Sequence, residues 1–296
     1  MRYDVIIVGG SYAGLSAALS LARARRRILV VDAGLRRNRY AAHSHGFLTQ
    51  DGSDPAVIAQ QGRAQLMAYN TVEWLTGNVI DVERTAHSFR LGIEGAAPRE
   101  ASRVILASGV VDLLPDIPGL TESWGSRVFH CPYCHGYELN QGQIGILATS
   151  AMSMHFALML PDWGTTTLFL NEAFEPNLEQ LTALAARGVV VEREAVQRID
   201  GDVDIVLRSG RTARMDGLFI PTRVEVASPL AAMLGCEFDE GAFGQIIRTD
   251  RMKATTVKGV YACGDVARAG GSVPLAVGDG AIAGAATHQS LIFDNH

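Results

Sequence analysis

Two cysteines are separated by two residues in the segment 131–135, Cys-Pro-Tyr-Cys-His, and this spacing is typical of a redox-active dithiol. Cys131 and Cys134 can close to a disulfide and reopen, with a cysteine of lowered pKa acting as the reactive thiolate. His135 adds an imidazole that can carry a proton near neutral pH. Zinc sites also begin with Cys-x-x-Cys but need two more ligands, and His130 and His135 lie too close in sequence for an ordinary structural zinc fold. We therefore favour redox chemistry, with no metal.

The composition is that of a compact α/β enzyme. The chain has 296 residues, enough for two domains, with 48% hydrophobic residues, 19% charged residues and 31 glycines. A net charge of −5 without a long basic run argues against a nucleic-acid-binding surface. The sequence contains no apolar run of about 18 residues, the length that a membrane span needs. The N-terminus does not match a signal peptide, because Asp4 interrupts its apolar run. Four cysteines are too few for a disulfide-stapled secreted scaffold, so we expect a cytoplasmic enzyme in which Cys236 and Cys263 are structural.

The first part of the chain carries the pattern of a dinucleotide-binding unit. An apolar strand, a glycine-rich turn, an alanine-rich helix, a second strand and an acid follow one another at residues 3–8, 9–14, 15–24, 28–31 and 32. Gly9 permits the tight turn and Gly14 the close packing of helix on strand, while Ser11 stands where a glycine is usual. The helix N-terminus would face a pyrophosphate, and Asp32 would bind an adenosine ribose.

A second cofactor pattern lies near the other end of the sequence. Residues 259–265 form an apolar strand that ends in a Gly-Asp turn, and an alanine-rich helix is expected from Ala281. The aspartate can accept hydrogen bonds from a ribityl hydroxyl, and the amides of the next helix can face the pyrimidine edge of a flavin. Another apolar strand, within residues 104–109, ends in small residues that allow a cofactor to approach the backbone closely.

Together, these motifs resemble the low-molecular-weight thioredoxin reductase family of flavin disulfide oxidoreductases, across nearly the whole chain. The resemblance implies an α/β fold with two Rossmann-like, three-layer nucleotide-binding-type domains, the second inserted in the first. Residues 1–113 plus 244–296 would form a FAD-binding domain, and residues 114–243 would form the inserted domain that carries the dithiol. The resemblance also implies a homodimer and electron exchange between FAD and the disulfide.

The family pattern further implies the roles of individual residues. Cys134 would face the flavin and Cys131 would exchange with the outside substrate. His135 stands where the reductases have an acid–base aspartate, so proton transfer would move to an imidazole. The positions expected to bind FAD are Gly9, Ser11, Ala13, Gly14, Asp32, Asn38, His45, Gln50, Val79, Ala107, Gly109, Gly264, Asp265 and Val273.

The inserted domain departs from the reductase pattern at its own nucleotide turn. Where the family has Gly-x-Gly-x-x-Ala, this chain has Ala148, Ser150 and Ser153, and each added Cβ obstructs the approach of a pyrophosphate to the backbone. Residues 171–176 are acidic and lack arginine, whereas relatives that use NADPH have a His/Arg-rich cluster there for the 2′-phosphate. The sequence therefore argues against NADPH as the direct reductant.

The combination of the Gly-Gly-Ser-Tyr-Ala-Gly turn, residues 43–52 and the Cys-Pro-Tyr-Cys-His-Gly-Tyr-Glu segment is similar to the dithiol-oxidase branch of this family, which includes enzymes that close the disulfides of gliotoxin and holomycin. In that branch a substrate dithiol reduces the enzyme disulfide, electrons pass to FAD, and oxygen reoxidises the flavin with release of peroxide. By this resemblance residues 43–52 would lie against the flavin; the alternative is a loop that only caps the FAD domain. The expected partners are a small-molecule dithiol or a thioredoxin-like protein, with oxygen as acceptor.

Two alternatives remain open. One is a thioredoxin reductase-like enzyme that is supplied with electrons by NADPH or by another donor such as ferredoxin. The other is a flavin-based redox sensor that passes its disulfide state to a protein partner.

Overall fold

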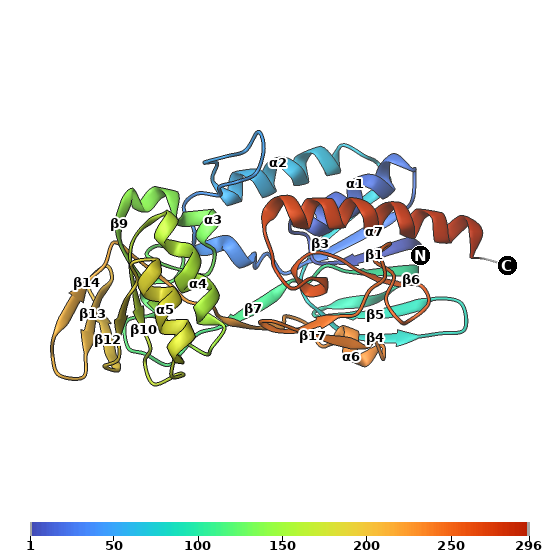
Figure 1. Ribbon diagram of the computed structural model, residues 1–296. Helices are drawn as coiled ribbons and strands as arrows, with labels where there is room; N and C mark the ends of the chain where they lie inside the picture. The colour runs from blue at the N-terminus through green and yellow to red at the C-terminus, as the bar shows by residue number, and fades with distance from the viewer. Residues whose placement is uncertain (1, 295–296) are drawn as a thin grey trace.

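The computed structural model describes residues 2–294, which form two units side by side (Figure 1). The first unit is built on a sheet in the order β3-β2-β1-β6-β5-β4, and β19 pairs with residues 104–106 at the end of β6, beyond the residues that pair with β5. Strands β3, β2, β1, β6 and β19 run parallel to one another, and β5 runs antiparallel to its two neighbours, β6 and β4. The strand bounds are β1 Arg2–Val8, β2 Ile28–Asp32, β3 Val72–Thr76, β4 Val79–Arg84, β5 Phe89–Ile93, β6 Ala96–Leu106 and β19 Val260–Ala262.

The central strands are continuous apolar runs because helices or other segments cover both of their faces. Ile6 and Ile7 of β1 point to opposite faces of the sheet, and both are fully buried. Val8 at the end of β1 pairs with Val31 of β2 and Leu106 of β6, so three strands end together at one edge. The carboxyl ends of parallel strands are where α/β sheets bind nucleotides.

Helices α1, α2 and α7 cover one face of this sheet, as Figure 1 shows; they span Tyr12–Arg23, Pro55–Met67 and Val273–Phe293. The expectation that the last helix begins at Ala281 is wrong: Pro274 lies in its first turn, where proline fits, and the helix starts eight residues earlier, at Val273. Gly280 and Gly284 therefore lie inside α7. A Cβ at Gly280 would meet the backbone oxygen of Ala13 at 2.1 Å, so the glycine allows α7 to pack directly on α1.

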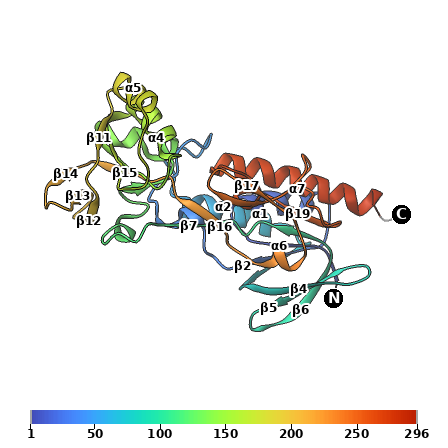
Figure 2. The same cartoon turned by 60° about the horizontal axis from the view of Figure 1, so that its bottom comes forward.

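The second unit has a parallel sheet in the order β11-β10-β9-β15-β8, and an antiparallel sheet β12-β13-β14 lies at its outer edge (Figure 2). Its helices are α3 Pro132–His135, α4 Ser153–Met159 and α5 Leu178–Ala186. Its strands are β8 Val128–Phe129, β9 Gln141–Leu147, β10 Gly164–Phe169, β11 Val190–Glu192, β12 Val196–Asp200, β13 Asp204–Leu207, β14 Thr212–Arg214 and β15 Gly217–Phe219. The α/β class expected from the sequence is confirmed.

An antiparallel pair of strands connects the two units: β7 leads into the second unit and β16 leads back. After β16 the chain forms α6, β17 and β18 before it reaches β19. Leu230, Ala231 and Cys236 of this returning segment pack in the core of the first sheet, although residues 114–243 were expected to form the inserted domain. The exact division into domains stays a prediction. The bounds are β7 Val110–Leu113, β16 Arg223–Val226, α6 Leu230–Met233, β17 Phe238–Gly241 and β18 Gly244–Ile247.

Short 3₁₀ turns occur at Arg37–Tyr40, Thr121–Ser123, Tyr137–Leu139, Leu160–Asp162 and Asp265–Ala267. Among the described residues, no helix is both long and apolar enough to span a membrane.

Candidate functional site

A cavity of about 790 Å³ lies where strands β1, β2 and β6 end, and it extends to the dithiol of the second unit. Its volume is within the range of small-molecule and cofactor sites in proteins. The predicted positions that line it include Gly9, Asp32, Gly109 and Asp265, and also Cys134 and His135 from the second unit. One cavity therefore joins the strand ends of the first unit to one side of the dithiol.

The glycine turn at the cavity is shaped by close backbone contacts. Gly9 has a φ of +102°, and a Cβ there would meet the carbonyl oxygen of Ala107 at 2.3 Å. A Cβ at Gly14 would lie 1.9 Å from the carbonyl oxygen of Gly9, so only glycine lets α1 start this close to β1. The Gly10 N–H donates to Asp32 Oδ1 at 2.9 Å, which holds the carboxylate at the cavity wall.

These features fit a dinucleotide such as FAD. Gly109 has a φ of +72°, and a Cβ built there meets no heavy atom of the described residues within 4 Å, so its backbone is open to a ligand. The Nε of Arg36, on the same cavity wall, is buried without a hydrogen-bond partner among the described residues. A buried unpaired guanidinium N–H is costly unless a ligand accepts from it, and phosphate or ribose oxygens would do so.

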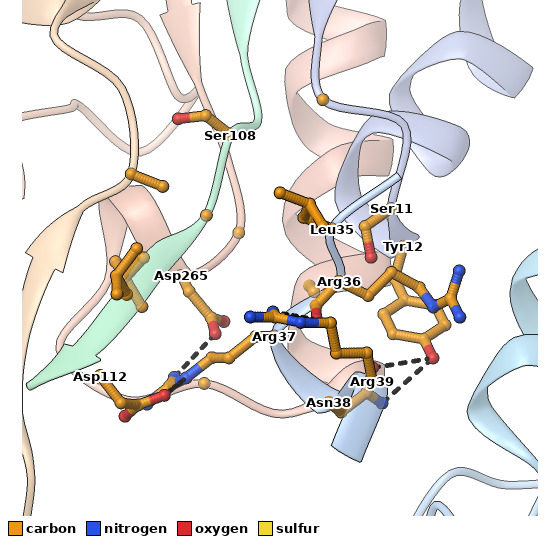
Figure 3. Close-up of a pocket in the computed structure, with 18 of the residues that line it drawn as sticks. Ser11, Tyr12, Leu35, Arg36, Arg37, Asn38, Arg39, Ser108, Asp112 and Asp265 are labelled. Atoms are coloured by element: carbon orange, nitrogen blue, oxygen red, sulfur yellow. Dashed lines mark hydrogen bonds and ion pairs between the residues drawn. The ribbon is translucent and has the colours of Figure 1, made fainter. Parts of the chain in front are cut away.

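Tyr12 and Asn38 connect the start of α1 to the turn after β2. The Asn38 amide donates to the Tyr12 hydroxyl at 3.1 Å, as Figure 3 shows. That hydroxyl in turn donates to the Pro55 carbonyl at 3.0 Å. Because both side chains line the cavity, this chain of hydrogen bonds fixes the wall formed by Arg37–Tyr40.

All the positions expected to bind FAD line this cavity except Gly14 and Gln50. Gly14 acts instead through the packing of α1 on the Gly9 turn. Gln50 lies in a local turn, where the Gln50 N–H bonds to the Phe47 carbonyl. Of the segment 43–52 only the first three residues, His43, Ser44 and His45, reach the cavity. The expectation that the whole segment lies against the cofactor is therefore too broad, since its remaining residues fold back on themselves.

Cys131 and Cys134 form a disulfide at the start of the short helix α3. Pro132 occupies the first helical position, where its missing N–H costs nothing, and the Cys134 N–H bonds to the Cys131 carbonyl. The two cysteines of the disulfide line different cavities. Cys134 lines the large cavity, whereas Cys131 lines a second cavity of about 180 Å³.

Two histidines flank the disulfide, and both have a pKa well below the ordinary value. His135 lines the large cavity and stacks on Phe129, with ring centroids 4.3 Å apart. Burial, followed by the nearby charge of His45, lowers the pKa of His135 to about 4. His130 lines both cavities, and burial, followed by the charge of Arg37, lowers its pKa to about 3. Both imidazoles are therefore neutral at pH 7.

Sequence reasoning missed an ion-pair cluster around Arg37 on the wall shared by the two cavities. The guanidinium bonds to Asp112 through two nitrogens, at 2.6 and 2.8 Å, and to Asp265 at 2.8 Å (Figure 3). The Thr222 hydroxyl also donates to Asp112, at 2.7 Å. The cluster therefore joins Arg37 of the first unit to Asp112 in β7 and, through Asp112, to Thr222 just before β16. The only signal in the sequence was an arginine-rich segment after β2.

Charge in this cluster is stabilised by pairing. Burial disfavours the charged form of Arg37, but hydrogen bonds and Coulombic attraction to Asp112, and then to Asp265, outweigh burial and raise its pKa. Burial by itself would raise the pKa of Asp112, but the hydrogen bond from Arg37 outweighs burial. The pKa of Asp112 is therefore lowered. Arg37 and Asp112 are therefore both charged at neutral pH.

The remaining cysteines are buried. Burial raises the pKa of Cys236, and it raises the pKa of Cys263 to about 12. A thiol with so high a pKa forms little thiolate, so neither residue is poised for exchange. Cys263 lines the large cavity, where its thiol acts as a small packed group.

The nucleotide turn of the second unit is closed by its own side chains. The Thr149 N–H donates to the hydroxyl of Ser153 at 3.2 Å, and the Met152 N–H donates to the hydroxyl of Ser150 at 3.3 Å. These backbone N–H groups are the kind that would otherwise face a pyrophosphate. The serines that replace the family's small residues therefore take up donors as well as space.

Arginines near the same turn are already paired with acids. Arg208 pairs with Glu172 at 2.9 Å, and Arg193 pairs with Glu175. Arg211 pairs with the neighbouring Glu192 and Glu194. The glutamates neutralise these arginines, so the arginines offer little free positive charge to a 2′-phosphate. Each of these exposed ion pairs contributes little to stability.

Comparison with known proteins agrees with this geometry. The family model described as pyridine nucleotide-disulphide oxidoreductase matches residues 3–280. A protein named thioredoxin reductase tcpT, from Claviceps purpurea, is 31% identical over 98% of this chain and 95% of its own. Thioredoxin reductase sirT from Leptosphaeria maculans is 32% identical over 95% of this chain and 92% of its own. A crystal structure of an oxidoreductase from Agrobacterium tumefaciens superimposes with a TM-score of 0.97 at 55% identity, covering 99% of both chains.

Proposed function

Because the chain belongs to the pyridine nucleotide-disulphide oxidoreductase family, as its resemblance to the thioredoxin reductases predicted, we propose that it oxidises a dithiol substrate to a disulfide. Electrons would enter through the Cys131–Cys134 disulfide, FAD held in the large cavity would supply their acceptor, and oxygen would finally take them and form peroxide. The observation that carries this direction is the nucleotide turn of the second unit, whose N–H donors are bonded to Ser150 and Ser153. With that turn closed, NADPH is not the direct reductant.

The large cavity has the residues to hold FAD. The family implies a flavin, and the N-terminus of α1 with the Gly9 turn would hold its pyrophosphate. Asp32 would bind the adenosine ribose, and Arg36 would give its unpaired N–H to an oxygen of the cofactor. Bound there, FAD supplies the two-electron acceptor that a dithiol requires and can return the pair to oxygen.

The residues of the chain perform the thiol exchange. A substrate thiolate attacks Sγ of Cys131, a new S–S bond forms, and the Cys131–Cys134 bond breaks to leave Cys134 as a thiolate. The second substrate thiolate then attacks the substrate sulfur of this mixed disulfide and displaces Cys131 as a thiolate. The substrate leaves as a disulfide and the enzyme holds the dithiol. Each substrate thiol loses its proton to solvent before it attacks. His135, neutral at pH 7 and beside Cys134 on the wall of the large cavity, keeps one ring N–H that would donate a hydrogen bond to the Cys134 thiolate.

The direct test is an anaerobic titration of the purified flavoprotein, first with NADPH and then with dithiothreitol, followed by air. We expect NADPH to leave the flavin absorbance unchanged over minutes, dithiothreitol to bleach it stoichiometrically, and air to restore it with release of peroxide. Rapid stoichiometric bleaching by NADPH would refute the proposal and favour a reductase. Bleaching by dithiothreitol without turnover in air would instead favour a redox sensor.

Cys134→Ser tests the role of the dithiol separately. We expect this variant to retain FAD and to lose flavin reduction by dithiothreitol, because the exchange reaction cannot deliver electrons without the Cys134 thiolate. Cys236→Ala, at a buried thiol that lines neither cavity, is the matched control and should keep activity. Undiminished turnover in Cys134→Ser would contradict the assignment.

A further inference from the structure

The imidazole of His135 lacks the hydrogen-bond partner that usually orients a histidine at a reactive site. At such sites a carboxylate or a backbone carbonyl commonly accepts from one ring nitrogen and so fixes the ring. Within residues 2–294, no side chain or backbone group hydrogen-bonds or ion-pairs with the His135 ring, although the residue is partly buried. The orientation of the ring must therefore come from packing.

Phe129 supplies this packing. Its ring centroid lies 4.3 Å from that of His135, and the two ring planes are only 16° apart, so the rings are stacked. A stacked neighbour covers the face of the imidazole and leaves its edge, where both nitrogens lie, free for other partners. Burial lowers the pKa of His135 to about 4, so one of these nitrogens carries a hydrogen at pH 7 and the other does not.

Phe129 is itself held firmly. It is the last residue of β8, it is buried, and its carbonyl accepts from the Ile220 N–H at 2.8 Å. Its ring also meets the ring of Phe219, the residue paired with it on β15, with centroids 5.7 Å apart. A side chain that is fixed in the core of a sheet holds a neighbouring group more precisely than a side chain on a loop would.

The titratable groups near His135 act on its charge but do not fix its ring. His45 lowers the pKa of His135 through its charge, and it lies 3.6 Å from Asp51 and 3.4 Å from Glu138. His130 has its own pKa lowered to about 3, so it is neutral at pH 7. Because none of these groups hydrogen-bonds to His135, Phe129 is the contact that sets the ring plane.

We infer that Phe129 is a positioning residue for the dithiol: its ring holds the imidazole of His135 so that a ring N–H is presented to the Cys134 thiolate. The inference rests on the proposed function, in which Cys134 becomes a thiolate when the disulfide opens. Cys134 and His135 both line the large cavity, so the N–H and the sulfur meet there. A donor that is already oriented stabilises the thiolate more than a donor that must first be ordered.

Phe219 offers a matched control for a substitution at Phe129. The two phenylalanines are partners on neighbouring strands, and both are buried in the same apolar cluster of the second unit. Phe219 lines neither cavity and makes no ring contact with His135. Phe129→Leu and Phe219→Leu therefore each remove one ring from the same core, but only Phe129→Leu removes the stack.

The experiment measures the rate of Cys134 alkylation by iodoacetamide against pH, in the FAD-loaded Cys131→Ser protein, with the modified peptide quantified by mass spectrometry. Cys134 is the reactive thiol in this background because Cys236 and Cys263 are buried. We expect Phe129→Leu to raise the pH midpoint of alkylation by about one unit, which is about tenfold less thiolate at a given pH. Phe219→Leu should leave the midpoint within about 0.3 unit of the starting protein.

Two further variants separate positioning from a general loss of packing. His135→Leu removes the donor and should raise the midpoint by about as much, and adding Phe129→Leu to it should produce no further rise, because Phe129 acts only through His135. Phe129→Tyr keeps an aromatic ring on His135 and should keep the original midpoint. Urea denaturation of Phe129→Leu and Phe219→Leu shows whether the two cost similar stability.

Equal midpoints for Phe129→Leu and Phe219→Leu would overturn the inference. A further rise when Phe129→Leu is added to His135→Leu would also overturn it, as would a shift in Phe129→Tyr as large as that in Phe129→Leu. Alkylation does not depend on the direction of electron flow or on the acceptor. The positioning role can therefore fail while dithiols still bleach the flavin, and the oxidase proposal can fail while the midpoints shift as expected.

Discussion

The histidine beside Cys134 makes the stability of the protein depend on pH in a specific window. His135 has its pKa lowered to about 4 in the folded protein by burial and by the charge of His45, whereas an unfolded histidine titrates near 6.5. Between these values the unfolded chain binds more protons than the folded chain. Stability should therefore be fully present above about pH 6.5 and should be lost as the pH falls toward 4.

The size of this effect follows from the two pKa values. A difference of about 2.5 pH units corresponds to a ceiling of about 3.4 kcal/mol for His135, reached below pH 4. At about pH 5 the unfolded histidine is almost fully protonated and the folded one is mostly neutral, which gives a loss of about 2 kcal/mol relative to pH 7.5. Since most natural proteins have about 5–15 kcal/mol of stability, this loss is readily measured.

The assay is urea denaturation with a fixed excess of FAD, for the wild type and for His135→Gln at about pH 7.5 and about pH 5. The variant lacks the titrating group, so the difference in unfolding free energy between wild type and variant should fall by about 2 kcal/mol at the lower pH. His155→Gln, at an exposed position of α4, controls for the general loss of a histidine. A wild-type-minus-variant difference that stays within about 0.5 kcal/mol at the two pH values would refute this reasoning.

Two further changes test the packing and the ion pairs described above. Arg37→Met leaves Asp112 and Asp265 without their cation in a mostly buried place, so we expect about 2–4 kcal/mol lower stability in urea denaturation; an unchanged midpoint would show that the cluster contributes nothing. Gly280→Val would place a Cβ 2.1 Å from the Ala13 carbonyl oxygen and force α7 away from α1, so thermal stability and FAD retention should fall, whereas Gly278→Val should have little effect. Equal behaviour of the two glycine variants would contradict the close-packing argument.

The sequence predicted those parts of the site whose geometry is determined by residues close together in the chain. The Gly9–Gly14 turn, the acid at Asp32 and the disulfide were each readable because short spacing determines their geometry. The start of α7 was misplaced because the helix was expected only from Ala281, after two glycines, whereas Gly280 is a packing residue inside the helix.

Long-range contacts could not be predicted in the same way. Arg37, Asp112 and Asp265 are far apart in the sequence, and nothing in any one segment indicates that they meet. The second cavity has the same origin, since Phe156 and Phe243 are brought together only when the returning segment packs against the second unit. Its position beside Cys131 therefore emerges from the tertiary structure alone.

The order of the strands along the chain has a consequence for biosynthesis. The sheets of the second unit use only residues from Val128 to Phe219, so they can form as soon as that stretch has left the ribosome. The first unit, by contrast, waits for β19 and α7, which are translated later and supply Gly264 and Val273 to the wall of the large cavity. We therefore expect the second unit to be folded before the cofactor can be captured, and a nascent chain stalled before α7 to carry a formed dithiol unit with no complete place for FAD.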